Sequence, residues 1–343
     1  KNGERFGAAR GYLHPVMSRP NLTVMTGVTV NKVLFDGKRA TGVEILQKRK
    51  KVTLEGAEII LSGGAINSPK LLKLSGVGPK DELEKHGIPL VHELPGVGEN
   101  LQDHPDILVV QKSKRSDTIA ITPGVLFLKG PVALYNYIFK RTDLLTSNVA
   151  ESGGFIKSRP EEEIPDIQFH MSSVRLDNHG LNLSFTFGYG YSGHACVLRP
   201  KSRGTLKLKD ANPNSHPLID PNLLDHPDDF EGMVRGVKAV RKIFAQKAFD
   251  SWRGDEIFPG NHVQSDEEIR EFIRQKADNI YHPVGTCKMG HDDMAVVDDT
   301  LKVHGMEGLR VVDSSIMPTL VGGNTTAPTI MIAEKASDMI LGS

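Results

Sequence analysis

The sequence LRVVDSSIMPTLVGGNTTAP, residues 309–328, decides the fold class of this chain. It opens as a short apolar strand, continues through a carboxylate and two hydroxyls, and reaches a glycine-rich loop before the helical pattern that starts at Pro328. A strand, a loop and a helix N-terminus in that order are how α/β proteins present polar groups to a phosphate-bearing ligand. The segment therefore predicts an α/β fold that binds a ligand at this loop.

A second turn from a strand into a helix lies in the sequence EIILSGGAINSPKLLKLSG, residues 58–76. We expect its helix to begin at Pro69, with Asn67 or Ser68 as the cap, and to end at Gly76. Glycines at the end of a strand let the backbone approach a ligand closely. A tight turn without a ligand is the alternative that this pattern leaves open.

Short apolar runs predict antiparallel strands on both sides of this turn. Residues 22–61 indicate a meander with a hairpin at Asp36-Gly37. Four further runs predict strands of a second sheet at 166–170, 184–187, 195–198 and 205–208. The sequence GYGYSG, residues 188–193, has the spacing of the dinucleotide fingerprint, but a strand follows it where that fingerprint requires a helix. We therefore predict a loop between strands there.

Two helices precede the tail. We expect Asp228 or Asp229 to cap a helix over 230–246, and Ser265 with Glu268 to form a capping box at the start of the next helix. That second helix ends just before His282 and would hold its loop in place.

Composition limits the class of function. The chain has 343 residues with 42 basic and 42 acidic side chains, so its formal charge of zero argues against binding to nucleic acid. The two cysteines give neither a disulfide framework nor a metal site, and no apolar run reaches the roughly 18 residues of a membrane span. We expect a cytoplasmic protein, with peripheral association with the inner membrane left open. Lys1 stands where an initiator Met is expected, which suggests a fragment or a processed chain.

Two side chains of the tail are candidates for chemistry at a hydroxyl group. His282 is a candidate base because a neutral imidazole, with an ordinary pKa of about 6.5, can accept a proton near neutral pH. Asn324 can donate an amide hydrogen bond to an oxygen that becomes negative. We expect the two to face one substrate oxygen. His104 precedes Pro105 in a polar loop and is predicted to be structural.

Four motifs make the chain resemble the glucose-methanol-choline (GMC) flavoprotein oxidoreductases: residues 64–78, 281–290, 311–318 and 323–331. The resemblance spans essentially the whole chain and looks strongest toward the bacterial choline dehydrogenase and alcohol dehydrogenase branch. It implies FAD-dependent oxidation of a primary alcohol to the aldehyde, with His282 as the base and Asn324 at the second active-site position. It also implies contacts to FAD from Val28, Gly64, Ala65, Asn100, Asp313, Ser314, Gly323, Thr325 and Thr326.

The chain departs from the family at its beginning. The N-terminal βαβ unit that holds ADP, with its glycine fingerprint, is not in this sequence. We therefore expect residues 1–105 to be a partial FAD-binding domain of Rossmann type, and residues 281–343 to return to it with the active site. Residues 106–280 would form a substrate-binding domain with an antiparallel sheet and helices.

The sequence leaves three functions open. The first is an alcohol dehydrogenase that passes electrons to a quinone or a similar acceptor, and the second is an oxidase that reduces oxygen. The third is a fragment that does not retain FAD and is not catalytic. No aromatic or acidic cage for a quaternary ammonium is evident, so a simple primary aliphatic alcohol is the preferred substrate over a choline-like one.

Overall fold

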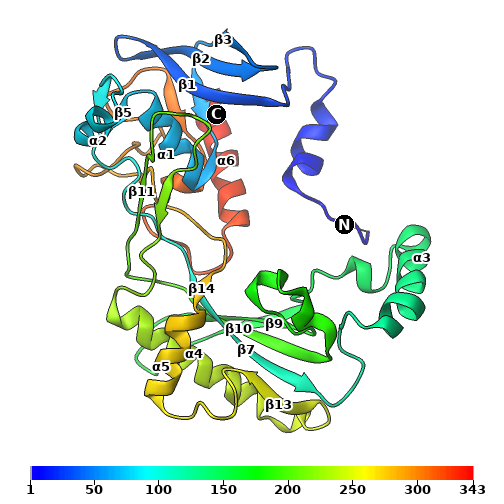
Figure 1. Ribbon diagram of the computed structural model, residues 1–343. Coiled ribbons are helices and arrows are strands. Elements are labelled where there is room, and N and C mark those ends of the chain that lie inside the picture. Colours follow the sequence, from blue (N-terminus) through cyan, green and yellow to red (C-terminus); the bar gives the residue numbers. More distant parts are fainter. Residues whose placement is uncertain (1, 343) are drawn as a thin grey trace. The chain divides into compact units, whose positions relative to one another are not determined.

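The computed structural model describes residues 2–342, without the side chains of Leu126 and His179, as a mixed α/β protein in two compact units (Figure 1). Unit 1 holds the N-terminal segment to Thr26, Asp106–Cys196 and Gly232–Ala277. Unit 2 holds Gly27–Pro105, Val197–Glu231 and the chain from Asp278. The chain passes from one unit to the other after Thr26, Pro105, Cys196, Glu231 and Ala277, and the predicted domains, 1–105, 106–280 and 281–343, stay predictions. The functions assigned to these domains stay predictions.

Unit 2 carries the meander and the two strand-to-helix turns. Its strands are β1 (Val28–Asp36), β2 (Arg39–Gln47), β3 (Lys50–Glu55), β4 (Ile59–Leu61), β5 (Val77–Gly78), β6 (His92–Glu93), β11 (Thr205–Lys207), β12 (Leu218–Asp220), β14 (Asp278–Asn279) and β15 (Leu309–Val311). Its helices are α1 (Gly64–Leu74), α2 (Lys80–Lys85) and α6 (Thr326–Leu341), with a 3-10 turn, η8, at Ser314–Ile316. Strands β1, β2 and β3 form the predicted meander, drawn in blue in Figure 1.

The core of unit 2 explains why residues far apart in sequence meet. Strand β15 pairs in parallel with β4, so that Val311 lies opposite Leu61. Both strands end at the same edge, and each is followed by polar residues and a helical turn. Leu61, Leu309 and Val311 are buried in one apolar cluster that also includes Ile332 of α6. The predicted arrangement of strand, loop and helix is therefore confirmed for both turns.

Helix α1 begins earlier than predicted. It starts at Gly64, so Pro69 lies inside the helix and neither Asn67 nor Ser68 is its cap. Proline lacks the N–H that would bond the carbonyl four residues before it. The hydroxyl of Thr286 donates to that Ala65 carbonyl at 2.7 Å instead. The misplaced start has a tertiary cause, because a residue from the distant tail replaces the missing hydrogen bond.

Unit 1 is built on an antiparallel sheet with the strand order β13-β7-β10-β9-β8. The strands are β7 (Pro105–Ser113), β8 (Ser152–Ile156), β9 (Ile167–Ser172), β10 (Gly190–Val197) and β13 (Arg253–Phe258). The helices are α3 (Gly130–Lys140), α5 (Asp266–Lys276) and, from Gly232 onward, α4 (Pro227–Phe244). Tyr191 of β10 meets Phe244 of α4 edge to face at 4.8 Å, which packs the helix on the sheet.

Two strand predictions in unit 1 have different outcomes. The sequence GYGYSG is followed by a strand rather than a helix, as predicted, but residues 190–193 already belong to that strand, β10, where a loop was predicted. Residues 184–187 form a 3-10 turn, Leu183–Phe187, where a strand was predicted. Alternation of apolar residues over four positions is too short to distinguish these structures.

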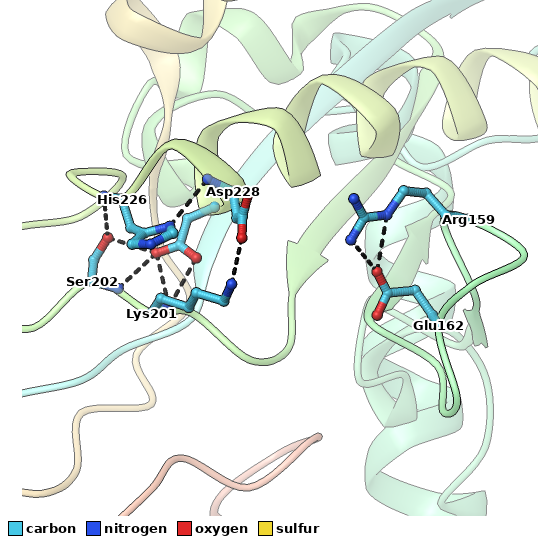
Figure 2. Close-up of polar contacts among 7 residues, drawn as sticks. Arg159, Glu162, Lys201, Ser202, His226 and Asp228 are labelled. Atoms are coloured by element: carbon cyan, nitrogen blue, oxygen red, sulfur yellow. Dashed lines mark hydrogen bonds and ion pairs between the residues drawn. The ribbon is translucent and has the colours of Figure 1, made fainter.

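Of the two predicted helix caps, one is confirmed and the other is wrong. Ser265 and Glu268 form the predicted capping box, and the backbone N–H groups of Ser265 and Gln264 lower the pKa of Glu268 to about 2. Asp228 and Asp229 do not precede α4 but lie in its first turn. Figure 2 shows Asp228 beside Lys201 and His226, while Asp229 accepts from the N–H groups of Lys201 and Ser202. These carboxylates hold the loop at Lys201 and Ser202 to the first turn of the helix.

The last helix begins two residues before the predicted start, at Thr326, with Thr325 at its N-cap. No side chain in the described part of the chain caps it. The first N–H groups of the helix, those of Thr326 and Ala327, thus have no side-chain cap and can bond a ligand or water, while Pro328 has no N–H.

Candidate active site

His282 lies at the centre of a buried polar cluster in unit 2. Its side chain and that of His104 meet edge to face, with Nδ1 of one ring 2.9 Å from Nδ1 of the other. Nε2 of His104 lies 3.1 Å from the carbonyl oxygen of Leu198 and 3.0 Å from that of Val321. His104 is fully buried and His282 is 8% exposed. The imidazole of His282 is thus held on one side by a second imidazole.

A buried carboxylate fixes the backbone of both histidines. Oδ1 of Asp103 accepts the backbone N–H of His104 and that of His282, each at 2.8 Å. Gln102 and Val284 exchange a pair of backbone hydrogen bonds at 3.1 and 2.9 Å. The chain around residue 103 therefore runs beside the chain around residue 283, which sets where both rings lie.

Asn324 approaches the other side of the imidazole. Its Nδ2 lies 3.4 Å from Nε2 of His282. Asn324 stands on the glycine-rich loop before α6, 42 positions after His282 in the sequence. The predicted pair is therefore brought together in the structure, and Nε2 of His282 is the ring atom on the side of the amide.

The loop after His282 makes a turn that only glycine suits at Gly285. Its φ is +94°, and an added Cβ would lie 2.4 Å from the carbonyl oxygen of Asn100. Asn100 also has a left-handed backbone, with φ of 61°. Its Nδ2 donates to the carbonyls of Gly285 and Pro318, both at 3.2 Å. The side chain of Asn100 thus holds two loops together, and its predicted contact to FAD stays a prediction.

Asp313 and Ser314 connect the two strand-to-helix turns with the histidine loop. Oδ2 of Asp313 accepts the backbone N–H of Gly64 at 2.8 Å and the hydroxyl of Ser68 at 2.5 Å. The hydroxyl of Ser314 donates to the carbonyl of Pro283 at 3.3 Å. Helical turn η8 contacts both α1 and α6. These residues order the edge of the sheet where the candidate site lies.

The other residues predicted to contact FAD lie near the edge where β4 and β15 end, except Val28. Gly64 and Ala65 open α1, and Gly323, Thr325 and Thr326 precede or open α6. Val28 opens β1 and pairs with Gln47, which ties it to the meander. None of the ligand contacts predicted for these residues is tested by their positions alone.

The geometry nevertheless fits a bulky phosphate-bearing cofactor. Gly64 has a φ of +75°, and a Cβ added there or at Gly323 would have no described atom within 4 Å. Glycines with open space at the Cβ position suit close approach of the backbone to a ligand. Together with the uncapped start of α6, these glycines form a cradle on the edge where β4 and β15 end.

Comparison with known proteins identifies the family. Two sequence models described as GMC oxidoreductase match residues 1–106 and 200–333, which is more than half of the chain. This chain belongs to the GMC oxidoreductase family. The predicted family is therefore confirmed, and so is FAD as the cofactor of that family.

Individual relatives of this GMC oxidoreductase chain agree with that family. It is 50% identical over 344 residues to an alcohol dehydrogenase [acceptor] of Pseudomonas putida, covering 99% of this chain and 62% of the relative. It is 46% identical over 345 residues to an oxygen-dependent choline dehydrogenase of P. putida strain F1, covering 100% and 60%. The solved structure of an FAD-dependent oxidoreductase from Chaetomium thermophilum matches 99% of this chain and 65% of its own, with 25% identity and a TM-score of 0.86. The chain thus spans about 60% of the length of the curated relatives it matches.

His104 is the residue of this GMC oxidoreductase chain that the sequence interpretation missed. A histidine before proline in a polar loop was predicted to be structural, yet its ring contacts the candidate base. The one sequence signal was its place in a dense run of polar residues, Glu99 to Asp106, between apolar segments. That signal does not indicate which distant residue the ring meets.

Asp103 makes the stability of the chain depend on pH. Burial raises the pKa of its carboxyl from 3.8 to about 6, although the N–H groups of His282 and His104 act in the opposite direction. Between these values the folded state holds a proton that the unfolded state has released, so the free energy of unfolding falls as pH rises. As pH rises from 4 to 7, the free energy of unfolding of Asp103→Asn should increase by about 1 to 3 kcal/mol relative to that of the native chain. Urea unfolding at both pH values measures this difference.

A control residue should show the opposite sign. Burial of Asp298 opposes ionisation, but hydrogen bonds from Thr300 and Lys302 lower its pKa. Asp298→Asn should therefore lose stability relative to the native chain as pH rises from about 3 to about 5. If Asp103→Asn also lost stability relative to the native chain as pH rises, folding would not raise the pKa of the Asp103 carboxyl.

Proposed function

We propose that this chain carries the catalytic part of an FAD-dependent oxidoreductase that converts a primary alcohol into the aldehyde. One observation carries the proposal: Nε2 of a buried histidine, His282, is flanked by the amide of Asn324. An imidazole lone pair beside an amide donor suits a hydroxyl group that loses its proton.

In the proposed reaction, His282 and Asn324 have separate roles. Nε2 of His282 accepts the hydroxyl proton of the alcohol, and Asn324 donates a hydrogen bond to the oxygen as it becomes negative. When bound, FAD supplies the acceptor for the hydride that leaves the carbinol carbon. The products are the aldehyde, a protonated imidazole and the reduced cofactor.

The residues around the glycine cradle would hold FAD. Gly64 and Gly323 allow its close approach, and the first N–H groups of α6 suit its negatively charged parts. Asp313 would act mainly by ordering Gly64 and Ser68, since its carboxylate already accepts from both.

Asn324→Ala should lower kcat by about 10²-fold and change KM less than threefold, because the amide acts on the developing charge. Steady-state kinetics of the flavin-loaded protein measure both constants. Asn324→Asp is the matched control, since it keeps the size but replaces the donor with an acceptor, and it should be at least as slow. An effect of Asn324→Ala on KM alone would contradict the proposed role.

The substrate class is proposed from the two matched relatives, which are named for alcohol and for choline. We favour a simple aliphatic primary alcohol, as the sequence indicates no cage for a quaternary ammonium. Comparison of kcat/KM for a straight-chain primary alcohol and for choline tests this preference. A higher value for choline would reverse it.

The electron acceptor is proposed to be a quinone or a similar compound. Turnover with a soluble quinone should exceed turnover with oxygen by at least tenfold in this case. Faster reaction with oxygen would identify the oxidase alternative. The third alternative, a fragment without FAD, predicts no flavin absorbance in the purified 343-residue chain.

Association with the periphery of a membrane is part of the proposal. Among residues 2–342, no helix combines the length and apolarity needed to cross a bilayer. Helix α3 and the helical turn before it nevertheless expose large apolar side chains, here together called the α3 stripe, with Phe127 at 78%, Leu128 at 74% and Phe139 at 70%. This stripe supports an apolar contact that a lipid surface would provide.

The charges beside the stripe favour anionic lipid as its partner. Lys129 and Lys140 are exposed beside it, Arg141 is exposed and pairs with Glu4 at 3.1 Å, and the sequence from Thr118 to Thr142 contains no acidic residue. Basic residues next to an exposed apolar helix are typical of a helix that lies in a membrane interface.

A triple substitution of Phe127, Leu128 and Phe139 by Ser should weaken binding to vesicles of phosphatidylcholine and phosphatidylglycerol by at least about tenfold, because each apolar side chain contributes about 1.5 to 3 kcal/mol when buried. Cosedimentation measures the bound fraction. Leu218→Ser with Ile219→Ser, on exposed strand β12, is the matched control and should bind normally. Equal binding by both variants would contradict the proposed surface.

A further inference from the structure

We infer that His104 fixes the tautomer of His282, so that Nδ1 of His282 carries the proton and Nε2 presents a lone pair. His104 is thereby a positioning residue, because it acts through the ring of His282. The inference rests on the proposed function of His282 as the base, and it adds the reason why the correct nitrogen is available.

The tautomer of His104 is set at its Nε2. Its Nε2 lies within hydrogen-bond distance of two carbonyl oxygens, those of Leu198 and Val321. Carbonyl oxygens only accept hydrogen bonds, so Nε2 of His104 must carry a hydrogen. In a neutral imidazole the other nitrogen is then an acceptor. Nδ1 of His104 is therefore the acceptor in its contact with His282.

The tautomer of His104 determines the tautomer of His282. Nδ1 of His282 lies 2.9 Å from this acceptor, so it must be the donor. With its proton on Nδ1, neutral His282 has its lone pair on Nε2. The tautomer of the candidate base is thus set by two backbone carbonyls on the other side of His104.

The contact with Asn324 gives the same answer independently. The amide nitrogen of Asn324 donates and does not accept, and it lies 3.4 Å from Nε2 of His282. A hydrogen on Nε2 would place two donors against each other. Both sides of the ring therefore require the lone pair on Nε2.

Burial supports a neutral His104. The ring is fully buried, and its two nitrogens face two carbonyls and the ring of His282. The carboxyl of Asp103 accepts the backbone N–H groups of both histidines through Oδ1. A neutral acceptor at Nδ1 also remains suited to His282 after it has gained the substrate proton, because Nδ1–H of the imidazolium still donates to it.

The same geometry allows the ring of His104 to be changed while the backbone stays held by Asp103. His104→Asn puts an amide oxygen close to the place of Nδ1 and keeps the acceptor. His104→Leu has a similar size and no acceptor. Both variants lose the contact of Nε2 with the two carbonyls, so the difference between them isolates the acceptor that faces His282.

The test combines nitrogen NMR with kinetics on the flavin-loaded protein labelled with ¹⁵N-histidine. Long-range ¹H–¹⁵N correlation should show hydrogen on Nδ1 of His282 in the native protein and in His104→Asn. In His104→Leu this pattern should be lost and kcat should fall by about 10²-fold, since an imidazole in the wrong tautomer cannot accept the proton. The kcat of His104→Asn should be at least about tenfold higher than that of His104→Leu. Both variants should have an unchanged flavin content.

Two outcomes would overturn the inference: hydrogen on Nε2 of His282 in the native protein, or an unchanged tautomer and rate in His104→Leu. The native spectrum decides the tautomer even where a variant fails to fold. Failure of the proposed function is distinguishable, because His282→Ala would then retain its rate whatever the spectrum shows. Loss of activity in His282→Ala with normal activity in His104→Leu would contradict only the role of His104.

Discussion

His282→Ala is expected to lower kcat for alcohol oxidation by about 10²- to 10⁴-fold, the usual contribution of a general base. Bound FAD should be retained, because the imidazole contacts His104 and Asn324 while the glycine cradle lies at Gly64 and Gly323. Steady-state kinetics and the flavin absorbance of the same preparation measure both quantities.

Two controls separate loss of the base from loss of structure. Added imidazole should restore part of the rate to His282→Ala, since it can enter the space left by the side chain. His291→Ala removes an exposed histidine of the same tail and should stay within about twofold of the native rate. Near-normal turnover of His282→Ala would exclude this residue as the base.

Lys73→Met is expected to cost about 3 to 5 kcal/mol of unfolding free energy, because it leaves a largely buried carboxylate without its cation. Nζ of Lys73 is fully buried, and it donates to Glu82 at 2.7 Å and to the carbonyl of Leu206 at 2.6 Å. Oε1 of Glu82 also accepts the N–H of Leu208 at 2.6 Å. The pair therefore ties α1 to α2 and β11, and urea unfolding measures the loss.

The double variant Lys73→Met with Glu82→Gln should recover more than half of that loss, because it removes the unpaired charge and keeps an acceptor for Leu208. Lys80→Met breaks an ion pair with Glu84 in which both side chains are about half exposed, and it should change stability by less than about 1 kcal/mol. A loss below about 1 kcal/mol for Lys73→Met would mean that Glu82 finds other partners or neutralises.

The sequence predicted those features that depend on neighbours along the chain. Ser265 and Glu268 stand three residues apart, so their capping box forms wherever the helix lies. The hairpin at Asp36-Gly37 and the strand before each of the two glycine turns followed from local patterns of the same kind, whereas the parallel pairing of these two strands was not predicted. Motifs at 281–290 and 323–331 also indicated His282 and Asn324 through the family resemblance.

The errors arose where a distant residue supplied a missing partner. Pro69 was predicted to start α1, but the hydroxyl of Thr286 satisfies the carbonyl that proline leaves open. Asp229 was predicted as a possible cap of α4, but the loop at Lys201 and Ser202 uses its carboxylate. Such contacts join residues that no local pattern connects.

By itself the sequence determined the α/β class, the family and the two polar residues of the candidate site. Only the tertiary structure showed that His104, 178 positions before His282, lies against its ring, and that Asp103 holds both backbones. The physical reason is that a side chain's type is fixed by the sequence, whereas the proton on an imidazole nitrogen is fixed by whichever groups surround it after folding.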